Sequence, residues 1–509
     1  MRGVHGVENA ENDDACSGAF SSHEGNGIEM TASAEDAERS QLELSPEEML
    51  ALASRASELL VARISGLSAD PPWRGGTREE LEPLLRSAAP EQGRPAREVL
   101  DFAAREILPR ASRVDHPRFF AFVPSCATWP GVLADYMSSG YNVFQGTWLG
   151  AGAPSLIELV VLDWFREWVG YPETASGLFT SGGSAASLDA FVAAREAAGG
   201  PERPSVYMSD QSHTALSRAA HIVGVRPEYV RKVKSDGRFR MDMAELARAV
   251  AEDRADGLTP IAVCANAGAT NTGAVDPMPE LADFCEAESI WFHVDAAYGG
   301  FAVLTEQGKA LLRGMERADS IAMDAHKWLF QPFEAGCLMV KDVRRLESAF
   351  SVEPEYLQDT QWGPGHPNFG DRGLQLSRSF RALKVWMSIQ TFGVAAFRRA
   401  VAKGMELAER AEVYAIESEL LQVANPASMG VVCFRFNPRD SGLSNEELEA
   451  INKAVQAKVI STGTAMTSST RLRGLYSLRF CILNHNTEWT HVRETLEAIE
   501  RFGQEELAN

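Results

Sequence analysis

Short apolar runs alternate with amphipathic stretches between residues 115 and 385. They predict strands at 178–180, 205–208, 260–265, 289–294, 320–323 and 336–340. Several runs are apolar almost without a break, as expected of strands that are buried on both faces of a sheet. Helical patterns such as 185–198 separate the runs, and crossover helices of this kind join parallel strands. The pattern predicts a large α/β domain around a mainly parallel sheet over residues 115–385.

The chain before this domain divides into two parts. Residues 1–44 are rich in acidic side chains and poor in large apolar ones, so we expect a disordered acidic tail. Ser45 and Glu48 then form a capping-box pattern ahead of a helical apolar stripe. We expect a helical arm over residues 45–114, with a second helix near 97–108.

The pattern changes after residue 385. Two alternating segments, 431–436 and 476–483, predict strands, and a helical pattern follows each of them. Ser444 and Glu447 form a second capping box at the start of the first of these helices. The sequence therefore predicts a smaller C-terminal α/β domain over residues 386–509.

Composition narrows the possible partners. The net charge of −21 argues against binding to nucleic acid or to an anionic membrane, since both need clustered positive charge. The seven cysteines contain no C-x-x-C pair, so neither a disulfide framework nor a metal site is expected. A reducing cytoplasm fits this pattern best. The chain lacks an apolar run of about 18 residues, and its first residues do not form a signal peptide.

One lysine stands out in the sequence SIAMDAHKWLF. Lys327 follows a predicted buried strand and precedes Trp328, Leu329 and Phe330. Because burial disfavours an ammonium ion, we expect the pKa of Lys327 to fall below its usual value of about 10.4. A neutral amine of this kind can attack a carbonyl group. The alternative is a lysine at a strand end that extends its amine to solvent.

Two further residues lie where α/β proteins place their sites. Asp295 ends the predicted strand in SIWFHVDAAYGG, and His213 follows another strand near the start of a helix. If the ligand is pyridoxal phosphate, an aspartate can pair with its ring nitrogen. A histidine ring can stack on the cofactor ring or move protons. A helix-capping aspartate and a structural histidine are the alternatives.

The segment GLFTSGGSAASLDAF has the pattern of an anion-binding turn. Gly182, Gly183 and Ser184 lie between a short strand and a helix, where small residues let backbone N–H groups approach a phosphate. The spacing is neither that of a dinucleotide-binding loop nor that of a nucleotide triphosphate loop. Gly-Gly-Ser is also a common turn without a ligand.

Taken together, the turn, the histidine, the aspartate and the lysine occur in an order that resembles the group II pyridoxal-phosphate-dependent amino acid decarboxylases. This family includes aromatic-L-amino-acid and glutamate decarboxylases. HVDAAY and HKWL are the most specific segments, and HPRFFAFVPS and SRSFRALKVW are similar as well. The resemblance implies a type I, aspartate-aminotransferase-like fold, pyridoxal 5'-phosphate as cofactor, and a homodimer with active sites at the subunit interface.

The resemblance also implies roles for individual residues. Lys327 resembles the lysine that binds the cofactor, Asp295 the partner of its ring nitrogen, and His213 the histidine that stacks on its ring. The remaining cofactor-binding positions that it implies are Gly182, Gly183, Ser184, Thr270, Ala297 and His326. Asp324 departs from the family, which often has asparagine there. A carboxylate beside a phosphate dianion is repelled unless it is protonated or turned away, which puts direct phosphate contact by Asp324 in doubt.

The same resemblance favours decarboxylation of an aromatic amino acid to an amine and CO2. Tyr356, in the polar segment 351–373, matches the loop tyrosine that protonates the alpha carbon. The implied substrate pocket is apolar and aromatic, and it contains Phe122, Val123, Pro124, Ser125, Phe144 and Trp148.

Several alternatives stay open. An oxygen-consuming aldehyde synthase, a lyase or a transaminase on the same fold, and an aliphatic or acidic substrate are rivals within the enzymes. A catalytically inactive dimeric scaffold is the rival outside them.

Overall fold

The computed structural model describes residues 42–124, 126–351, 359–360, 362–363 and 365–508. It divides into two compact units, Met1–Ser57 and Glu58–Asn509, and the start of helix α1 (Pro46–Gly66) belongs to the first. At that start the Glu48 amide donates to the Ser45 hydroxyl at 3.1 Å, and the Ser45 amide donates to the Glu48 carboxylate at 2.8 Å. The predicted capping box is therefore confirmed.

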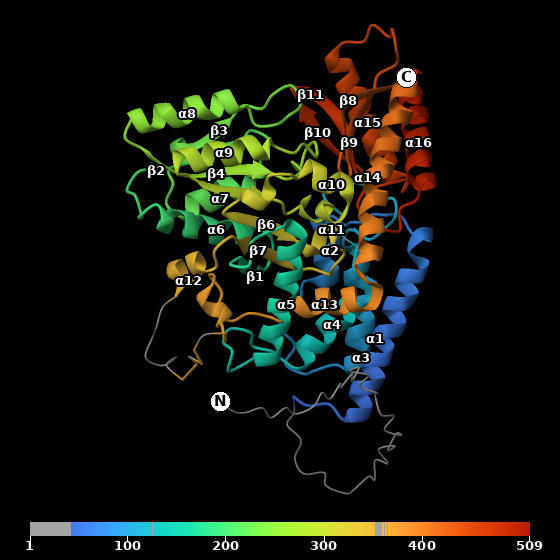
Figure 1. Ribbon diagram of the computed structural model, residues 1–509. Helices are drawn as coiled ribbons and strands as arrows, with labels where there is room; N and C mark the ends of the chain where they lie inside the picture. The colour runs from blue at the N-terminus through green and yellow to red at the C-terminus, as the bar shows by residue number, and fades with distance from the viewer. Residues whose placement is uncertain (1–41, 125, 352–358, 361, 364, 509) are drawn as a thin grey trace, which may run out of the picture. The chain divides into compact units, whose positions relative to one another are not determined.

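A seven-stranded sheet forms the centre of the second unit (Figure 1), in the order β1-β7-β6-β5-β4-β2-β3. The strands are β1 (Ser176–Thr180), β2 (Pro204–Ser209), β3 (Val230–Val233), β4 (Thr259–Asn266), β5 (Trp291–Asp295), β6 (Ser320–Asp324) and β7 (Gly336–Val340). All neighbouring pairs from β6 to β3 are parallel, whereas β7 is antiparallel to both β1 and β6. The sheet is mainly parallel as predicted, and every predicted strand is present. The sequence pattern did not predict strand β3, because Arg231 and Lys232 interrupt its short apolar run.

Helices cover both faces of this sheet (Figure 1). Helices α6 and α7 pack on one face, and α8 and α9 pack on the other. The helices of this part are α4 (Trp129–Gly140), α5 (Gly152–Val169), α6 (Gly183–Ala197), α7 (Thr214–Ile222), α8 (Met243–Ala255), α9 (Met278–Glu288), α10 (Glu306–Leu311), α11 (Ala325–Trp328), α12 (Arg344–Phe350) and α13 (Ala382–Phe392). The strands are consequently buried on both faces, which explains their continuous apolar runs.

The C-terminal part contains a four-stranded antiparallel sheet in the order β10-β11-β9-β8. Its strands are β8 (Leu421–Ser428), β9 (Val431–Phe436), β10 (Ser468–Leu472) and β11 (Leu475–Cys481), and its helices are α14 (Val394–Glu417), α15 (Asn445–Ser461) and α16 (Trp489–Ala508). Both predicted strands are present, and the Ser444 capping box begins α15. The sequence pattern missed β8 and β10. The predicted domain boundary at residues 385 and 386 falls inside α13, which packs against α4 and α5.

The predicted helical arm contains α2 (Arg78–Leu85) and α3 (Ala96–Phe102). The α-helix predicted near 97–108 ends at Phe102. A π-helical turn begins at Ala103, and a 3-10 turn begins at Leu108. In the part of the chain that the structure describes, we find neither a helix that is long and apolar enough to cross a membrane nor a cluster of potential metal ligands.

A fully buried ion pair connects α5 to the first strand. The Arg378 guanidinium lies 2.6 Å from the Glu158 carboxylate, and neither side chain has any exposed surface. The same carboxylate accepts a hydrogen bond from the Phe179 amide at 2.8 Å, while Arg378 donates to the Phe179 carbonyl, also at 2.8 Å. These contacts hold β1 immediately before the glycine-rich turn.

We predict that Glu158→Gln destabilises the protein by about 3–5 kcal/mol, because it leaves the Arg378 charge buried without a counter-ion. The midpoint of urea unfolding measures this loss. As a matched control, Glu252→Gln breaks the exposed pair with Arg248 (57% and 59% exposed) and should cost less than about 1 kcal/mol. Equal losses in the two variants would contradict the assigned importance of the buried pair.

Candidate active site

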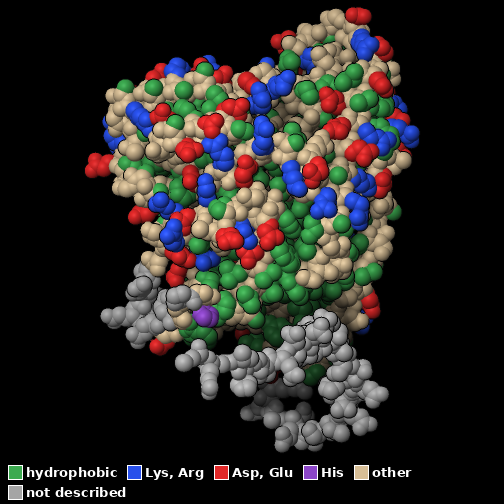
Figure 2. Space-filling view, viewed as in Figure 1, with side chains coloured by type: hydrophobic (Ala, Val, Ile, Leu, Met, Phe, Trp, Pro, Cys, Tyr) green, Lys and Arg blue, Asp and Glu red, His purple; other side chains and the backbone are tan. Residues whose placement is uncertain are grey.

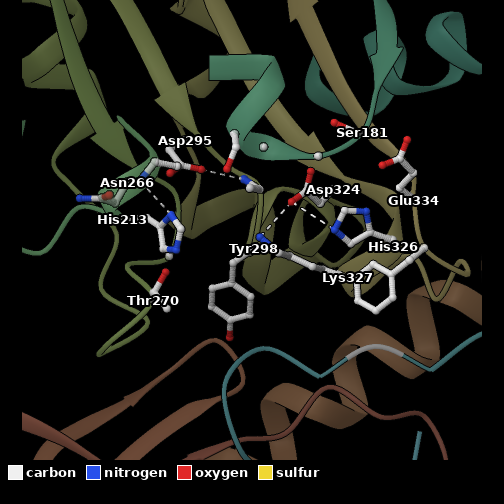
Figure 3. Close-up of a pocket in the computed structure, with 17 residues that line it drawn as sticks. Ser181, His213, Asn266, Thr270, Asp295, Tyr298, Asp324, His326, Lys327 and Glu334 are labelled. Atoms are coloured by element: carbon white, nitrogen blue, oxygen red, sulfur yellow. Dashed lines mark hydrogen bonds and ion pairs between the residues drawn. The ribbon is translucent and has the colours of Figure 1, made fainter. Parts of the chain in front are cut away.

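The carboxyl ends of the central strands open into a cavity of about 430 Å³. Parallel strands present these ends at one edge of a sheet, which is where α/β proteins bind ligands. Figure 3 shows the side chains that converge there from the ends of β4, β5 and β6. The lining comprises Ser181, Gly182, Gly183, Ser184, His213, Ala215, Asn266, Gly268, Thr270, Asp295, Ala297, Tyr298, Asp324, His326, Lys327, Phe333 and Glu334.

Every predicted cofactor-binding residue lines this cavity. They come from five separate segments of the chain, and they are Gly182, Gly183, Ser184, His213, Thr270, Asp295, Ala297, His326 and Lys327. The structure thus brings together what the sequence spreads over nearly 150 positions, from 182 to 327. Their individual roles stay predictions.

The glycine-rich turn joins β1 to α6 and requires its small residues. A side-chain carbon at Gly183 would lie 2.7 Å from the Ala297 side chain, and one at Gly336 would lie 2.3 Å from the Gly182 backbone. Helix α6 is 15 residues long, and its first amide groups have no acceptor within the helix. A turn of this kind at a helix N-terminus suits a phosphate group.

Asp324, His326 and Lys327 form a charged cluster at the end of β6 (Figure 3). The Lys327 amine lies 2.9 Å from the Asp324 carboxylate, and the His326 Nε2 atom lies 3.5 Å from it. Nδ1 of His326 accepts a hydrogen bond from the Ala335 amide at 3.1 Å, so the proton of the neutral ring is on Nε2. Burial lowers the pKa of His326, which favours this neutral form.

The expected fall in the pKa of Lys327 is wrong for this structure. Burial does oppose the charge of the amine, but the adjacent Asp324 carboxylate and the more distant Asp295 outweigh it, and the pKa is raised. The prediction of a lowered pKa was based on the apolar residues that follow Lys327. It did not include the effect of the Asp324 carboxylate, three positions before the lysine.

Asp295 occupies another part of the cavity, at the end of β5. Its Oδ1 atom accepts a hydrogen bond from the Ala297 amide at 3.2 Å. Burial raises the pKa of Asp295, while the Lys327 charge opposes that rise. A carboxylate in this setting gains stability from a further positive partner, such as a protonated ring nitrogen. The cavity therefore fits pyridoxal phosphate, with a turn for the phosphate, an acid for the ring nitrogen and an amine for the aldehyde.

His213 caps helix α7 and faces the same cavity. Its Nδ1 atom accepts a hydrogen bond from the Ala215 amide at 3.2 Å, so the structural role that we considered as the alternative is present. This contact also restrains the orientation of the ring (Figure 3). Capping and stacking on a cofactor are compatible roles for this histidine.

Sequence reasoning missed several of the lining side chains, among them Asn266, Tyr298, Phe333 and Glu334. Asn266 pairs in the sheet with Asp295, and its position at the end of a predicted strand was a usable signal. Tyr298 stacks on Trp328 at 5.4 Å, and its hydroxyl accepts a hydrogen bond from the Gly430 amide at 2.9 Å. No sequence pattern points to Phe333 or Glu334, because an irregular segment carries them.

The predicted substrate-binding residues that the structure describes do not line this cavity. Phe122, Val123, Pro124, Phe144 and Trp148 do not line it, and Ser125 and the predicted proton donor Tyr356 lie outside the described residues. Phe122 is 63% exposed and Phe144 is 41% exposed. The Trp148 ring packs edge-on against His366 at 4.9 Å. The described chain therefore assembles the cofactor part of the predicted site without the predicted substrate part.

Arg479 is a buried charge beside the cavity that the sequence did not single out. It donates hydrogen bonds to the Phe122 carbonyl at 2.5 Å and to the Asn271 carbonyl at 3.2 Å. Asn271 directly follows the cavity-lining Thr270. Arg479 thus connects β11 to the Phe122 segment and to one wall of the cavity.

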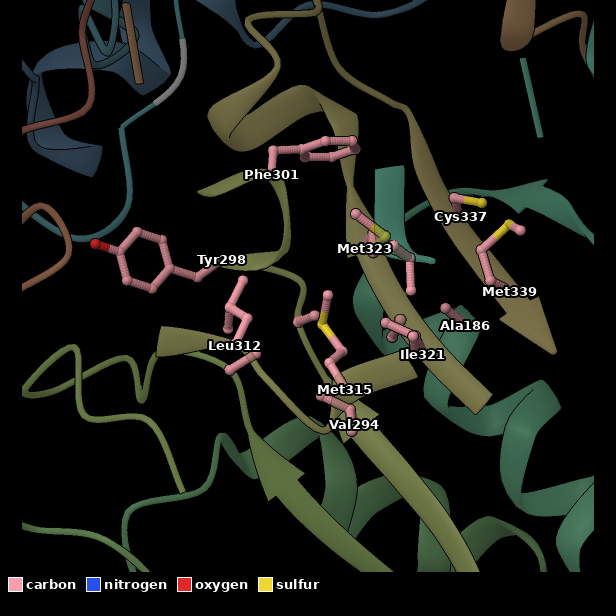
Figure 4. Close-up of a cluster of buried hydrophobic side chains, with 14 of the residues drawn as sticks. Ala186, Val294, Tyr298, Phe301, Leu312, Met315, Ile321, Met323, Cys337 and Met339 are labelled. Atoms are coloured by element: carbon pink, nitrogen blue, oxygen red, sulfur yellow. The ribbon is translucent and has the colours of Figure 1, made fainter. Parts of the chain in front are cut away.

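Tightly packed apolar side chains hold the strands that carry this site (Figure 4). Val294, Ile321, Met323, Cys337 and Met339 belong to a single buried cluster behind the ends of β5, β6 and β7. Each of these side chains is essentially inaccessible to water. Because interiors of this density resist displacement, Asp295 and Asp324 occupy defined positions.

Comparison with known proteins identifies similar sequences and structures. Residues 79–437 match the family model of the pyridoxal-dependent decarboxylase conserved domain. An aromatic-L-amino-acid decarboxylase of Bacillus atrophaeus is 38% identical over 467 residues, 91% of this chain and 97% of that protein. A phenylacetaldehyde synthase of Petunia hybrida is 31% identical over 434 residues, 81% of this chain and 85% of that protein.

A solved structure of a similar protein has the same fold. The Catharanthus roseus tryptophan decarboxylase in complex with L-tryptophan superposes with a TM-score of 0.85 at 27% identity, over 91% of this chain and 99% of that chain. These similarities confirm the predicted fold class and the resemblance from which it was inferred.

We predict that Gly183→Ala weakens the binding of pyridoxal phosphate by at least about tenfold, because the added carbon overlaps Ala297 and displaces the turn. Equilibrium titration of the cofactor absorbance measures the affinity. Gly237→Ala is the matched control, since an added carbon there meets nothing within 4 Å. Unchanged affinity in Gly183→Ala would exclude this turn from the cofactor site.

Proposed function

This chain belongs to the pyridoxal-dependent decarboxylase family, and from that premise we propose that it converts an aromatic L-amino acid to its amine and CO2. The cofactor is pyridoxal 5'-phosphate. The observation that carries the proposal is the convergence of Lys327, Asp295 and the glycine-rich turn in one cavity of a family member.

Pyridoxal phosphate supplies an electron sink for the bond that breaks at the alpha carbon. We propose that the turn after β1 binds its phosphate and that the amine of Lys327 holds its aldehyde. Asp295 keeps a proton on the ring nitrogen, since a buried carboxylate stabilises a positive partner. The ring of His213 is oriented by its contact with the Ala215 amide and would cover one face of the cofactor and exclude water there.

An aromatic substrate is supported by the chemistry of this chain and of its relatives. Lys327 is the only cationic side chain among the described lining residues, so the cavity offers no second cation to a side-chain carboxylate. Phe122, Phe144 and Trp148 do not line the cavity within one described chain, but they would offer flat apolar surfaces to an aromatic ring if a second copy brings them there. The Bacillus relative is an aromatic-L-amino-acid decarboxylase, and the Catharanthus relative binds L-tryptophan.

The aldehyde synthase is the second candidate, because the Petunia relative carries that name. The higher identity to the Bacillus decarboxylase, 38% against 31%, favours the amine. Tyr356 as the donor of a proton to the alpha carbon also favours the amine and stays part of the proposal. An aliphatic or acidic substrate lacks comparable support.

We further propose that two copies of the chain complete the active site. Hydrophobic side chains gather in the lower half of Figure 2, where α4, α5 and α13 lie. Exposed members on or near these helices are Leu133, Tyr136, Met137, Tyr141, Phe144, Leu149, Leu156 and Phe392. An apolar surface of this extent is typical of a protein interface. Because Phe144 belongs to it, a second copy can bring substrate-binding side chains to a cavity that lacks them.

We also propose a cytoplasmic location. Six cysteines of the described chain are free thiols, and all of them are buried. Unpaired thiols are typical of proteins that work in a reducing compartment.

An amino acid panel tests the reaction. Under air we expect CO2 and a matching amine from an aromatic amino acid, without peroxide. Lys327→Ala should reduce turnover by at least about 1000-fold and remove the yellow absorbance of the lysine-bound cofactor, because no other lining side chain is an amine.

Two outcomes of this panel would contradict the proposal. A yellow, active Lys327→Ala variant would exclude the role of Lys327. Aldehyde and peroxide from the unaltered protein would identify an aldehyde synthase, and Tyr356→Phe would then leave the products unchanged.

Analytical ultracentrifugation tests the second copy. We predict that Tyr136→Glu lowers dimer affinity by at least about 100-fold, since a buried unpaired carboxylate costs several kcal/mol. Activity should fall with dissociation and recover at high protein concentration. Val413→Glu is the control, because Val413 is similarly exposed (52%) but lies on α14. A fully active monomer would contradict shared active sites.

A further inference from the structure

Asp324 lies beside the glycine-rich turn and is only 2% exposed. Its carboxylate oxygens lie 3.3 and 3.7 Å from the position that a side-chain carbon would take at Gly183, and 3.9 Å separates Oδ1 from the corresponding position at Gly182. The carboxylate therefore faces the turn and is not turned away from it. Oδ1 is buried and has no hydrogen-bond partner among the described residues.

A phosphate group bound at this turn would lie close to the negative carboxylate of Asp324. A phosphate ester carries a charge of about −1.5 to −2 at pH 7. Two anions in contact in a buried site repel each other strongly, because little water screens them. Occupation of the turn therefore favours a neutral Asp324, and a neutral carboxyl group can donate a hydrogen bond to a phosphate oxygen.

The amine of Lys327 must lose a proton before it can react with an aldehyde. This amine lies 2.9 Å from Oδ2 of Asp324, and the raised pKa keeps it an ammonium ion. An ammonium ion has no free electron pair and cannot attack an aldehyde. The oxygen that can accept its proton is Oδ2 of Asp324, 2.9 Å away. The negative charge on this same carboxylate becomes unfavourable when a phosphate binds to the turn.

We propose that binding of the cofactor's phosphate moves one proton from Lys327 to Asp324. The Nζ–H bond of Lys327 breaks and an O–H bond forms on Oδ2, so that an ion pair becomes a neutral amine and a neutral acid. The total charge of the pair stays at zero. The acid then donates to the phosphate, and the amine is ready to bind the aldehyde. This inference rests on the proposed function, which places the phosphate at the turn.

The other titratable groups around Asp324 do not supply this proton. Burial lowers the pKa of His326 on α11, so its ring is neutral. Burial raises the pKa of Cys337 on β7, which stays a thiol, and also that of Asp295 on β5. Glu334 is bound by Arg381 at 2.6 Å. Among the described residues, Lys327 is the cation in direct contact with Asp324.

Infrared difference spectroscopy tests the proposal without turnover. The probe is pyridoxine 5'-phosphate, which has the ring and the phosphate of the cofactor but no aldehyde. At about pH 8.5, well above the second phosphate pKa of about 6, we expect the carbonyl stretch of a protonated carboxyl group to appear on binding. Pyridoxine without phosphate is the control for Asp295, because it presents the ring nitrogen and leaves the turn empty.

Asp324→Asn provides the matched variant. Its amide has no proton to acquire, so the phosphate-dependent band should be absent and the probe should bind about tenfold more tightly. Circular dichroism verifies the fold of the variant. If the variant does not fold, the comparison of pyridoxine phosphate with pyridoxine in the unaltered protein decides the question alone.

Calorimetry in two buffers of different ionisation enthalpy identifies the source of the proton. No net uptake from solvent, together with the band, is the expected result. Bound probe without the band would overturn the proposal. So would a band accompanied by uptake of one proton more than pyridoxine takes up, because Lys327 would then not be the donor. Failure of the probe to bind would overturn the cofactor site and this inference together. Detection of bound phosphate separates that case from the others.

Discussion

The charge balance at the carboxyl edge of the central sheet is the constraint on which this site depends. Two carboxylates, Asp295 and Asp324, and one amine, Lys327, line the same cavity. Burial opposes the charges of Asp295 and Lys327, and the opposite charges nearby offset that cost. A cofactor that brings a phosphate and a ring nitrogen must rearrange this balance on entry, so ligand binding and proton position are coupled.

The central sheet and the short helix after it position these three charged groups. Parallel pairing places Asp295 at the end of β5 opposite Ala322 of the neighbouring β6, and Asp324 ends β6 two residues later. The short helix α11 then returns the chain so that Lys327 faces Asp324. The apolar cluster behind these strands resists displacement, which fixes the spacing of the three charged groups.

The proposed substrate part of the site would need a second copy of the chain. Within one described chain, Phe144 and Trp148 do not line the cavity that holds the cofactor positions. Phe144 belongs to an apolar surface that is costly to leave in water. The proposed second copy accounts for both features, since it would cover the surface and bring substrate-binding side chains to the cavity.

Local pattern predicted most of the elements and the candidate cofactor positions. Strand-length apolar runs predicted the six longer strands of the central sheet, and the motifs around Gly182, His213, Asp295 and Lys327 predicted the cofactor positions, because each signal lies within a few neighbouring residues. Only the tertiary structure decided how these residues act on one another. The pKa of Lys327 rises because the Asp324 carboxylate lies against its amine. The Tyr298 hydroxyl binds the Gly430 amide, and residues 385 and 386 lie within helix α13. Charge, burial and long-range contact depend on distances in space, and the order of residues along the chain does not contain these distances.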